Sequence, residues 1–173
     1  MVDSTRYSVD QDKVLLLNNV WNKLRSFLPK SYQNIQIGLV FTDLPGIYNT
    51  YEGGYAVDST INIGTQYLNS IEGEISLAEI LAHEIGHHVL GHVNRRGDGH
   101  IHPMGEQDAD HFGMMLCELA GYPRRDYIDW FKAFEARRKP SLSQNHIDEH
   151  GTGDERIQKL EKQHTYLNEL DNI

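Results

Sequence analysis

The segment HEIGH at residues 83–87 constrains this chain more than any other feature of its sequence. Residues four apart lie on one face of an α-helix, so His83 and His87 can reach a single zinc ion while Glu84 projects beside them. The same stretch carries an apolar stripe formed by Leu77, Leu81, Ile85 and Val89. The pattern predicts a partly buried helix that bears half of a tetrahedral zinc site, with Glu84 as the general base.

A catalytic zinc site needs a third protein ligand and one open position for water. We favour Glu106, which stands 19 positions after His87 on a following helical segment. That length of chain allows a turn that brings the two helices side by side. Asp110, four residues further on the same helical face, can accept a hydrogen bond from the second ring nitrogen of a ligand histidine and fix its tautomer.

Other histidines compete with Glu106 for the third position, namely His88, His92, His100 and His102. The first two do not lie on the helical face that carries His83 and His87, and the last two occupy a glycine-rich loop. We interpret all four as exposed or locally hydrogen-bonded side chains.

Hydrophobic periodicity also outlines the segments before the motif. Residues 11–28 have apolar side chains at steps of three and four, which predicts an amphipathic helix that ends near Pro29. Residues 35–43 and 53–64 alternate and are rich in β-branched side chains, which predicts two strands. A small sheet should therefore precede the histidine-bearing helix.

Capping signals suggest where that helix begins and ends. Ser76 is followed three positions later by Glu79, the spacing of a capping box, so the helix is expected to begin near Ser76. It is expected to end near Gly97 or Gly99.

Three further helices are predicted after the motif. Pro103 suits the first turn of the next helix, which Gly121 and Pro123 should close. Residues 125–138 and 154–170 give two more helical patterns. The order of elements predicts an α+β fold in one domain, residues 1–173, with a small mixed sheet packed on a helical bundle.

Composition excludes several classes of function. The net charge is −9, from 25 acidic and 16 basic side chains, which disfavours a nucleic-acid partner because phosphate binding relies on a basic surface. The single cysteine, Cys117, has no partner for a disulfide or a cysteine-based zinc site, and we expect it to be a small buried core residue.

The chain carries no recognisable membrane or export signal. Its longest apolar runs are far shorter than the roughly 20 residues of a membrane-spanning helix. The polar N-terminal segment lacks the features of a signal peptide, so the chain as written is expected to be cytoplasmic, or periplasmic or secreted if a signal has been removed.

Four motifs in order resemble the gluzincin zinc metallopeptidases of the HtpX, Oma and CAAX prenyl protease type. HEIGHHVLGH (83–92) is similar to their active-site helix, and EQDADHFG (106–113) to the segment that supplies the third ligand and an orienting Asp. AGYPRRDYIDWF (120–131) and HGTGDERI (150–157) are similar to their later elements. Gly151 stands where the family usually has proline, and residues 49–51 only weakly match its entry to an edge strand.

The resemblance implies a zincin-like fold with the histidine-bearing helix at its centre and one zinc ion per chain. It implies a small, soluble, single-domain endopeptidase that acts on extended or unfolded proteins and peptides. It places His150 and Arg156 beside the oxyanion of the tetrahedral intermediate, whereas a surface ion pair with Asp154 or Glu155 is the alternative for Arg156. The large members' membrane helices are absent here, so their prenylated substrates do not carry over.

Two other functions stay open. A repressor-cleaving peptidase of the mobile-element type also joins this histidine motif to a Glu ligand, although Asp110 replaces the Asn expected there. A catalytically silent zinc-binding regulatory module is the other, which the presence of Glu84 disfavours. For the peptidase, an edge strand at residues 55–63 would bind an extended substrate through its backbone.

Overall fold

The computed structural model describes residues 9–40, 47–51, 59–92, 103–138 and 152–172. Along the chain the elements are α1 (Gln11–Arg25), β1 (Gln36–Val40), β2 (Ile47–Tyr51), β3 (Ser59–Gly64), α2 (Thr65–Ser70), α3 (Gly73–Val89), α4 (Pro103–Leu119), α5 (Arg124–Arg138) and α7 (Gly153–Asp171). The α+β class is confirmed. The short helix α2 was not expected.

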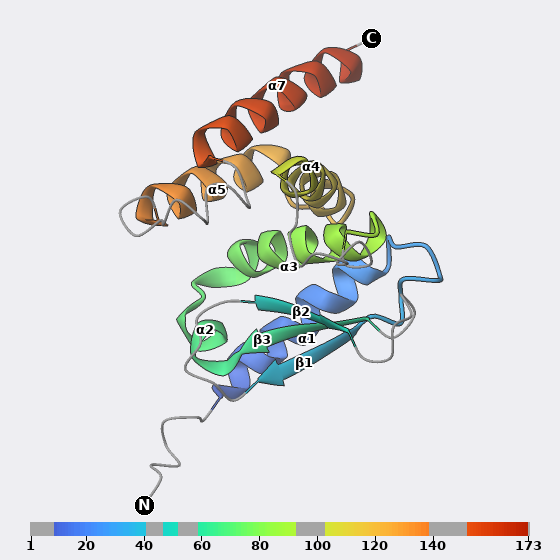
Figure 1. Cartoon of the computed structure of the whole chain (residues 1–173), viewed down its shortest axis with the longest axis vertical. Helices are drawn as coiled ribbons and strands as arrows, with labels where there is room; N and C mark the ends of the chain where they lie inside the picture. Colours follow the sequence, from blue (N-terminus) through green and yellow to red (C-terminus); the bar gives the residue numbers. More distant parts are fainter. Residues whose placement is uncertain (1–8, 41–46, 52–58, 93–102, 139–151, 173) are drawn as a thin grey trace, which may run out of the picture.

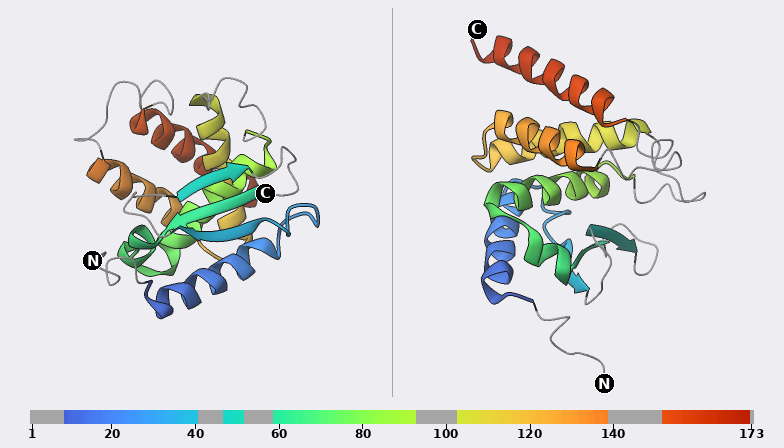
Figure 2. Two further views of the ribbon diagram at one scale, coloured as in Figure 1. Left: turned by 60° about the horizontal axis from the view of Figure 1, so that its bottom comes forward. Right: turned by 90° about the vertical axis from the view of Figure 1, so that its left-hand side faces the viewer.

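The helices and the sheet are arranged around α3, which carries the histidine motif (Figure 1). The sheet and α1 lie on one side of α3, and α4 and α5 lie on the other. Helix α7 packs on α4 and α5 as the outermost layer (Figure 2). Apolar side chains from both sides bury α3, since Leu77, Leu81 and Ile85 are fully inaccessible.

Within the described residues the sheet has three strands, in the order β1-β3-β2. β3 is parallel to β1, with Ile61 opposite Ile37, and antiparallel to β2, with Ile61 opposite Asn49. The hypothesis of an edge strand at residues 55–63 is therefore wrong for residues 59–63, because β3 is hydrogen-bonded on both sides. Residues 55–58 lie outside the described residues. Strand order depends on contacts distant in sequence, which alternation does not reveal.

Helix α3 is shifted towards the N-terminus relative to the prediction. It begins at Gly73, and the Ser76 hydroxyl donates to the Glu72 carbonyl instead of capping the helix. It ends at Val89, because Gly91 adopts a φ of +71° that L side chains rarely take. The Gly91 N–H then bonds to the His88 carbonyl and the His92 N–H to the His87 carbonyl, as in a Schellman motif.

Several other boundaries agree with the sequence. Helix α1 buries its predicted stripe at Leu17, Val20, Trp21 and Leu24, although it ends at Arg25, before the expected residue 28. Helix α4 begins at Pro103, and its C-terminus turns at Gly121, where φ is +85°. Cys117 is free and buried. Among the described residues no helix is both long and apolar enough to span a bilayer.

Two glycines let α3 and α4 approach closely. A Cβ added at Gly86 would stand 3.0 Å from the Ala109 carbonyl oxygen and 3.1 Å from its Cα. A Cβ added at Gly113 would stand 3.1 Å from the His83 backbone nitrogen and 2.7 Å from the Tyr127 hydroxyl. Because the two backbones already touch at both points, any larger residue would push the helices apart.

Glu79 is a buried acid within this packing. Its side chain points away from solvent, with 1% of its surface exposed, and neither carboxyl oxygen has a hydrogen-bond partner in the described part of the chain. Burial raises the pKa of Glu79 to about 9, and the Asp126 carboxylate adds to the shift. Cys117 of α4 and Tyr127 of α5 also interact with it electrostatically. Glu79 is therefore protonated at neutral pH.

This burial predicts a pH-dependent stability. The folded pKa of Glu79 lies above its ordinary value of 4.5, so its contribution to stability is complete below pH 4.5 and is lost as the pH rises towards 9. Between pH 5 and pH 8 the unfolding free energy of the metal-free wild type should fall by on the order of a few kcal/mol more than that of metal-free Glu79→Gln. Urea titrations measure this, with Glu169→Gln, an exposed site, as the control. Parallel pH profiles for wild type and Glu79→Gln would show that the acid is solvated.

Candidate metal centre

Three candidate ligands converge between α3 and α4. One atom each from His83, His87 and Glu106 lies within 4.8 Å of the other two. The Nε2 atoms of His83 and His87 are 3.0 Å apart, and they lie 3.4 Å and 3.5 Å from the two carboxylate oxygens of Glu106. All three side chains point their donor atoms at one another, as ligands of a single ion would.

The other ring nitrogens of the two histidines are also engaged. His83 Nδ1 lies 2.9 Å from Asp110 Oδ1, so the carboxylate accepts a hydrogen bond from Nδ1–H and leaves Nε2 to face Glu106. This is the arrangement expected from the sequence for Asp110. His87 Nδ1 lies 3.1 Å from His92 Nδ1.

His92 was expected to be an exposed or locally hydrogen-bonded side chain, and it contacts the candidate ligand His87. Its position follows from the turn at Gly91, because the bond from the His92 N–H to the His87 carbonyl brings the two residues together. A Gly four positions after His87, in the pattern HxxxG, is the signal that could have revealed it. His92 therefore stands behind a candidate ligand, in contact with the nitrogen that does not face Glu106.

Arg156 of α7 contacts both carboxylates of the cluster, those of Asp110 and Glu106. Its Nε and Nη2 each donate to one oxygen of Asp110 at 2.7 Å, and its Nη1 lies 3.5 Å from Glu106 Oε2. Only 5% of its surface is exposed. The alternative of a surface ion pair with Asp154 or Glu155 is wrong, because the guanidinium is buried against Asp110. A direct role on an oxyanion stays a prediction.

The ionisable side chains of this cluster shift one another's pKa values. Burial alone would raise the pKa of Asp110, but the guanidinium of Arg156 outweighs it and holds that pKa below its ordinary value. Burial, helped by neighbouring His83, lowers the pKa of His87 to about 3. Burial also disfavours the charged form of His83, yet hydrogen bonds to Asp110 and Glu106 raise its pKa to about 10. His83 is therefore the charged member of this histidine pair and His87 the neutral one.

This donor set suits zinc. Two imidazole nitrogens and one carboxylate oxygen are the protein ligands of one type of three-residue catalytic zinc site. A divalent ion would replace the positive charge that the histidines now hold. His83 keeps 17% of its side chain exposed, whereas those of His87 and Glu106 are 3% and 4% exposed, so access to the cluster is from the side of His83.

The remaining predicted residues are placed as follows. Glu84 lies on α3 beside the cluster and is half-buried. Among the rival ligands, His88 is buried but outside the cluster, and His92 contacts His87 rather than the converging atoms. His100, His102 and His150 lie outside the described residues.

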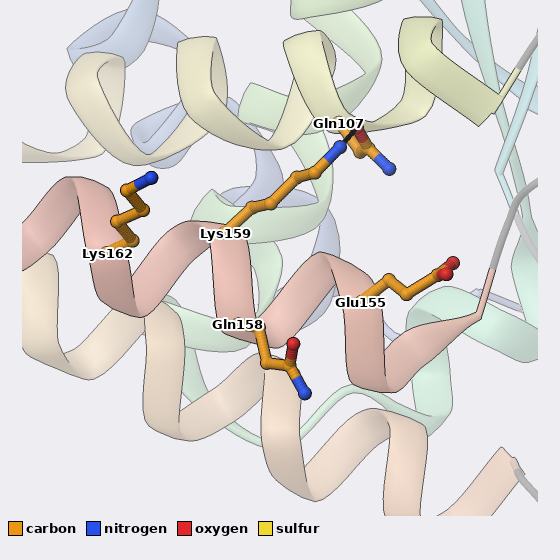
Figure 3. A pocket seen from close by; sticks show the side chains of 5 residues that line it. All are labelled: Gln107, Glu155, Gln158, Lys159 and Lys162. Carbon is orange, nitrogen blue, oxygen red and sulfur yellow. Dashed lines mark hydrogen bonds between the residues drawn. The ribbon is translucent and has the colours of Figure 1, made fainter.

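A polar hollow of about 390 Å³ marks the outer rim of the contact between α4 and α7 (Figure 3). It is lined by Gln107, Glu155, Gln158, Lys159 and Lys162. Lys159 donates to Gln107, and Glu155 forms the capping box of α7 with Thr152. The contact of Lys159 with Gln107 joins α7 to α4 one residue away from Glu106.

The network predicts that Asp110 supports metal binding without being a ligand. Asp110→Asn keeps the shape of the side chain but removes the charge that orients His83 and pairs with Arg156. Zinc affinity should fall by roughly 10- to 100-fold. Titration against a competing chelator measures this, with Asp108→Asn, an exposed position on the same helix, as the control. Equal affinities in the two variants would remove Asp110 from the support of the site.

Comparison with known proteins gives one match. Residues 32–99 match the model of peptidase family M48. Neither curated proteins nor solved structures gave a match. The matched region contains His83, Glu84 and His87 but ends before Glu106. The assignment of Glu106 as the third ligand therefore rests on its contacts in the structure. Residues 32–99 of this chain, which include the histidine motif, are thus similar to the M48 peptidases.

Proposed function

We propose that this protein is a zinc-dependent endopeptidase in which His83, His87 and Glu106 hold one zinc ion. The observation that carries the proposal is the convergence of these three side chains within 4.8 Å. His83 and His87 lie on α3, inside the region matched by the M48 model, and Glu106 lies on α4, beyond that region. The bound ion would supply a Lewis acid that polarises the substrate carbonyl and makes a water molecule acidic near neutral pH.

Glu84 is the proposed general base. It follows His83 directly in α3, so its carboxylate projects next to the ligand face without sharing it. It accepts a proton from the attacking water and later gives that proton to the leaving amine. A purely structural zinc site has no need of such a carboxylate.

We assign two side chains, Arg156 and His150, to the neighbourhood of the developing negative charge. Arg156 is held 3.5 Å from Glu106 Oε2 by its two bonds to Asp110, so it orients both carboxylates and keeps a positive charge beside the cluster. His150 is the proposed direct donor to the oxyanion, by its resemblance to the late motif of related peptidases.

An extended substrate would bind along an edge of the sheet. β2 has a partner only in β3 among the described strands, and it contacts α3, so it replaces residues 55–63 as the candidate for strand addition. Backbone pairing depends little on side chains and suits unfolded or extended chains as substrates. A cytoplasmic location and the absence of a nucleic-acid partner remain predictions from the sequence.

The roles of Glu84 and Glu106 are separable by substitution. Glu84→Gln should abolish hydrolysis of casein while zinc stays bound, because it removes a proton acceptor but no ligand. Glu106→Ala should instead lower zinc content, because it deletes a ligand oxygen. Metal analysis and casein cleavage on the same samples measure both.

The outcomes separate the alternatives. Full zinc content in Glu106→Ala would point to one of the rival histidines as ligand. Stoichiometric zinc in the wild type without any cleavage would favour the catalytically silent regulatory module. Cleavage confined to one repressor protein would favour the mobile-element peptidase.

Replacing His150 tests the oxyanion assignment. His150→Ala should lower turnover of a quenched peptide by about a hundredfold or more, since one oxyanion donor is worth about 3 to 4 kcal/mol. Zinc content and the melting temperature should stay near those of the wild type. Wild-type turnover in the variant would remove His150 from the site.

A further inference from the structure

A hollow of about 530 Å³ lies between α2, the N-terminal half of α3, and α5. Its volume falls within the roughly 300–1,000 Å³ typical of binding sites for small molecules and side chains. Its apolar lining consists of Tyr67, Ile71, Ile80, Trp130 and Phe134. The rings of Trp130 and Phe134 stack with centroids 5.1 Å apart and planes 18° apart.

One face of α3 leads from this groove towards the metal cluster. Ser76 and Ile80 line the groove, and His83 and His87 follow them at steps of three and four along α3. These steps place the four residues on one face of a single helix. At a rise of 1.5 Å per residue, Ile80 stands about 4.5 Å and Ser76 about 10 Å along the axis from His83.

That separation corresponds to a short length of substrate. An extended peptide advances about 3.3 Å per residue, so side chains one to three residues from the bond at the metal would reach the groove. The aromatic wall and the two isoleucines favour apolar side chains there. Glu72 and Arg137 also line the hollow, with opposite charges, so they give no preference for a charged side chain.

We propose that this groove is the specificity pocket of the enzyme and that it takes a large apolar side chain, aromatic or long aliphatic, of an extended peptide substrate. The inference rests on the proposed peptidase function. Such a pocket would make cleavage selective for bonds near a large apolar residue, although the backbone of β2 would bind any extended chain.

Binding can be measured apart from hydrolysis. The zinc-loaded Glu84→Gln protein is titrated into fluorescein-labelled glycine-serine peptides that carry Phe, Leu, Ala or Asp at one central position. Fluorescence anisotropy should show binding of the Phe and Leu peptides at least tenfold tighter than of the Ala and Asp peptides.

Two variants in this background test the location of the pocket. Ser76→Trp fills the groove from its floor, and Trp130→Ser removes the aromatic wall. Both should reduce the preference for Phe over Ala to less than threefold, with unchanged zinc content. Ser76→Trp should also keep the melting temperature, whereas Trp130→Ser should lower it, because Trp130 packs against the core. Leu119→Ser is the matched control, because Leu119 is an exposed apolar residue, 58% accessible, at the end of α4 away from the groove.

The results distinguish the two proposals. An undiminished preference for Phe in both variants, or no preference in the parent, would overturn the pocket. A second result would support the pocket and contradict the peptidase function. In that case both variants abolish the preference for Phe, but the zinc-loaded wild-type protein does not cleave the Phe peptide. Sedimentation that shows a dimer dissociated by Ser76→Trp would overturn the pocket in favour of a contact between copies of this chain.

Discussion

The close packing of α3 against α4 is the constraint on which the site depends. At Gly86 and Gly113 the backbones of the two helices touch, and a methyl group at either position would meet main-chain atoms of the opposite helix. This spacing lets a carboxylate as short as that of Asp110 reach His83, and it sets Glu106 opposite both Nε2 atoms. The candidate metal centre is therefore a property of helix packing as well as of the histidine motif.

A second interaction fixes the carboxylates from the far side. Arg156 arrives from the last helix of the chain and binds Asp110 through two hydrogen bonds, while its third nitrogen approaches Glu106. A buried cation here offsets two buried carboxylates, which would otherwise be costly to ionise. The cluster thus joins three helices separated by many residues in sequence, and formation of the site requires the whole helical half of the fold.

The sequence predicted the parts of this site that follow helical periodicity. The spacing of the histidines and the place of Glu106 and Asp110 on one face of a second helix depend only on local geometry. The contact of Arg156 with Asp110 could not be derived in that way, because it depends on how α7 lies across α4. His92 was missed because Gly91 ends the helix early, and the central position of β3 was missed because strand order is set by tertiary contacts.

The central claim is that two imidazoles and the carboxylate of Glu106 bind one zinc ion. X-ray absorption at the zinc edge, on protein loaded with one equivalent of zinc, counts the imidazoles directly. We expect one tightly bound ion per chain with two imidazole nitrogens and otherwise oxygen ligands. Three imidazoles in the spectrum, as coordination by His92 would give, or the absence of stoichiometric zinc would contradict the account.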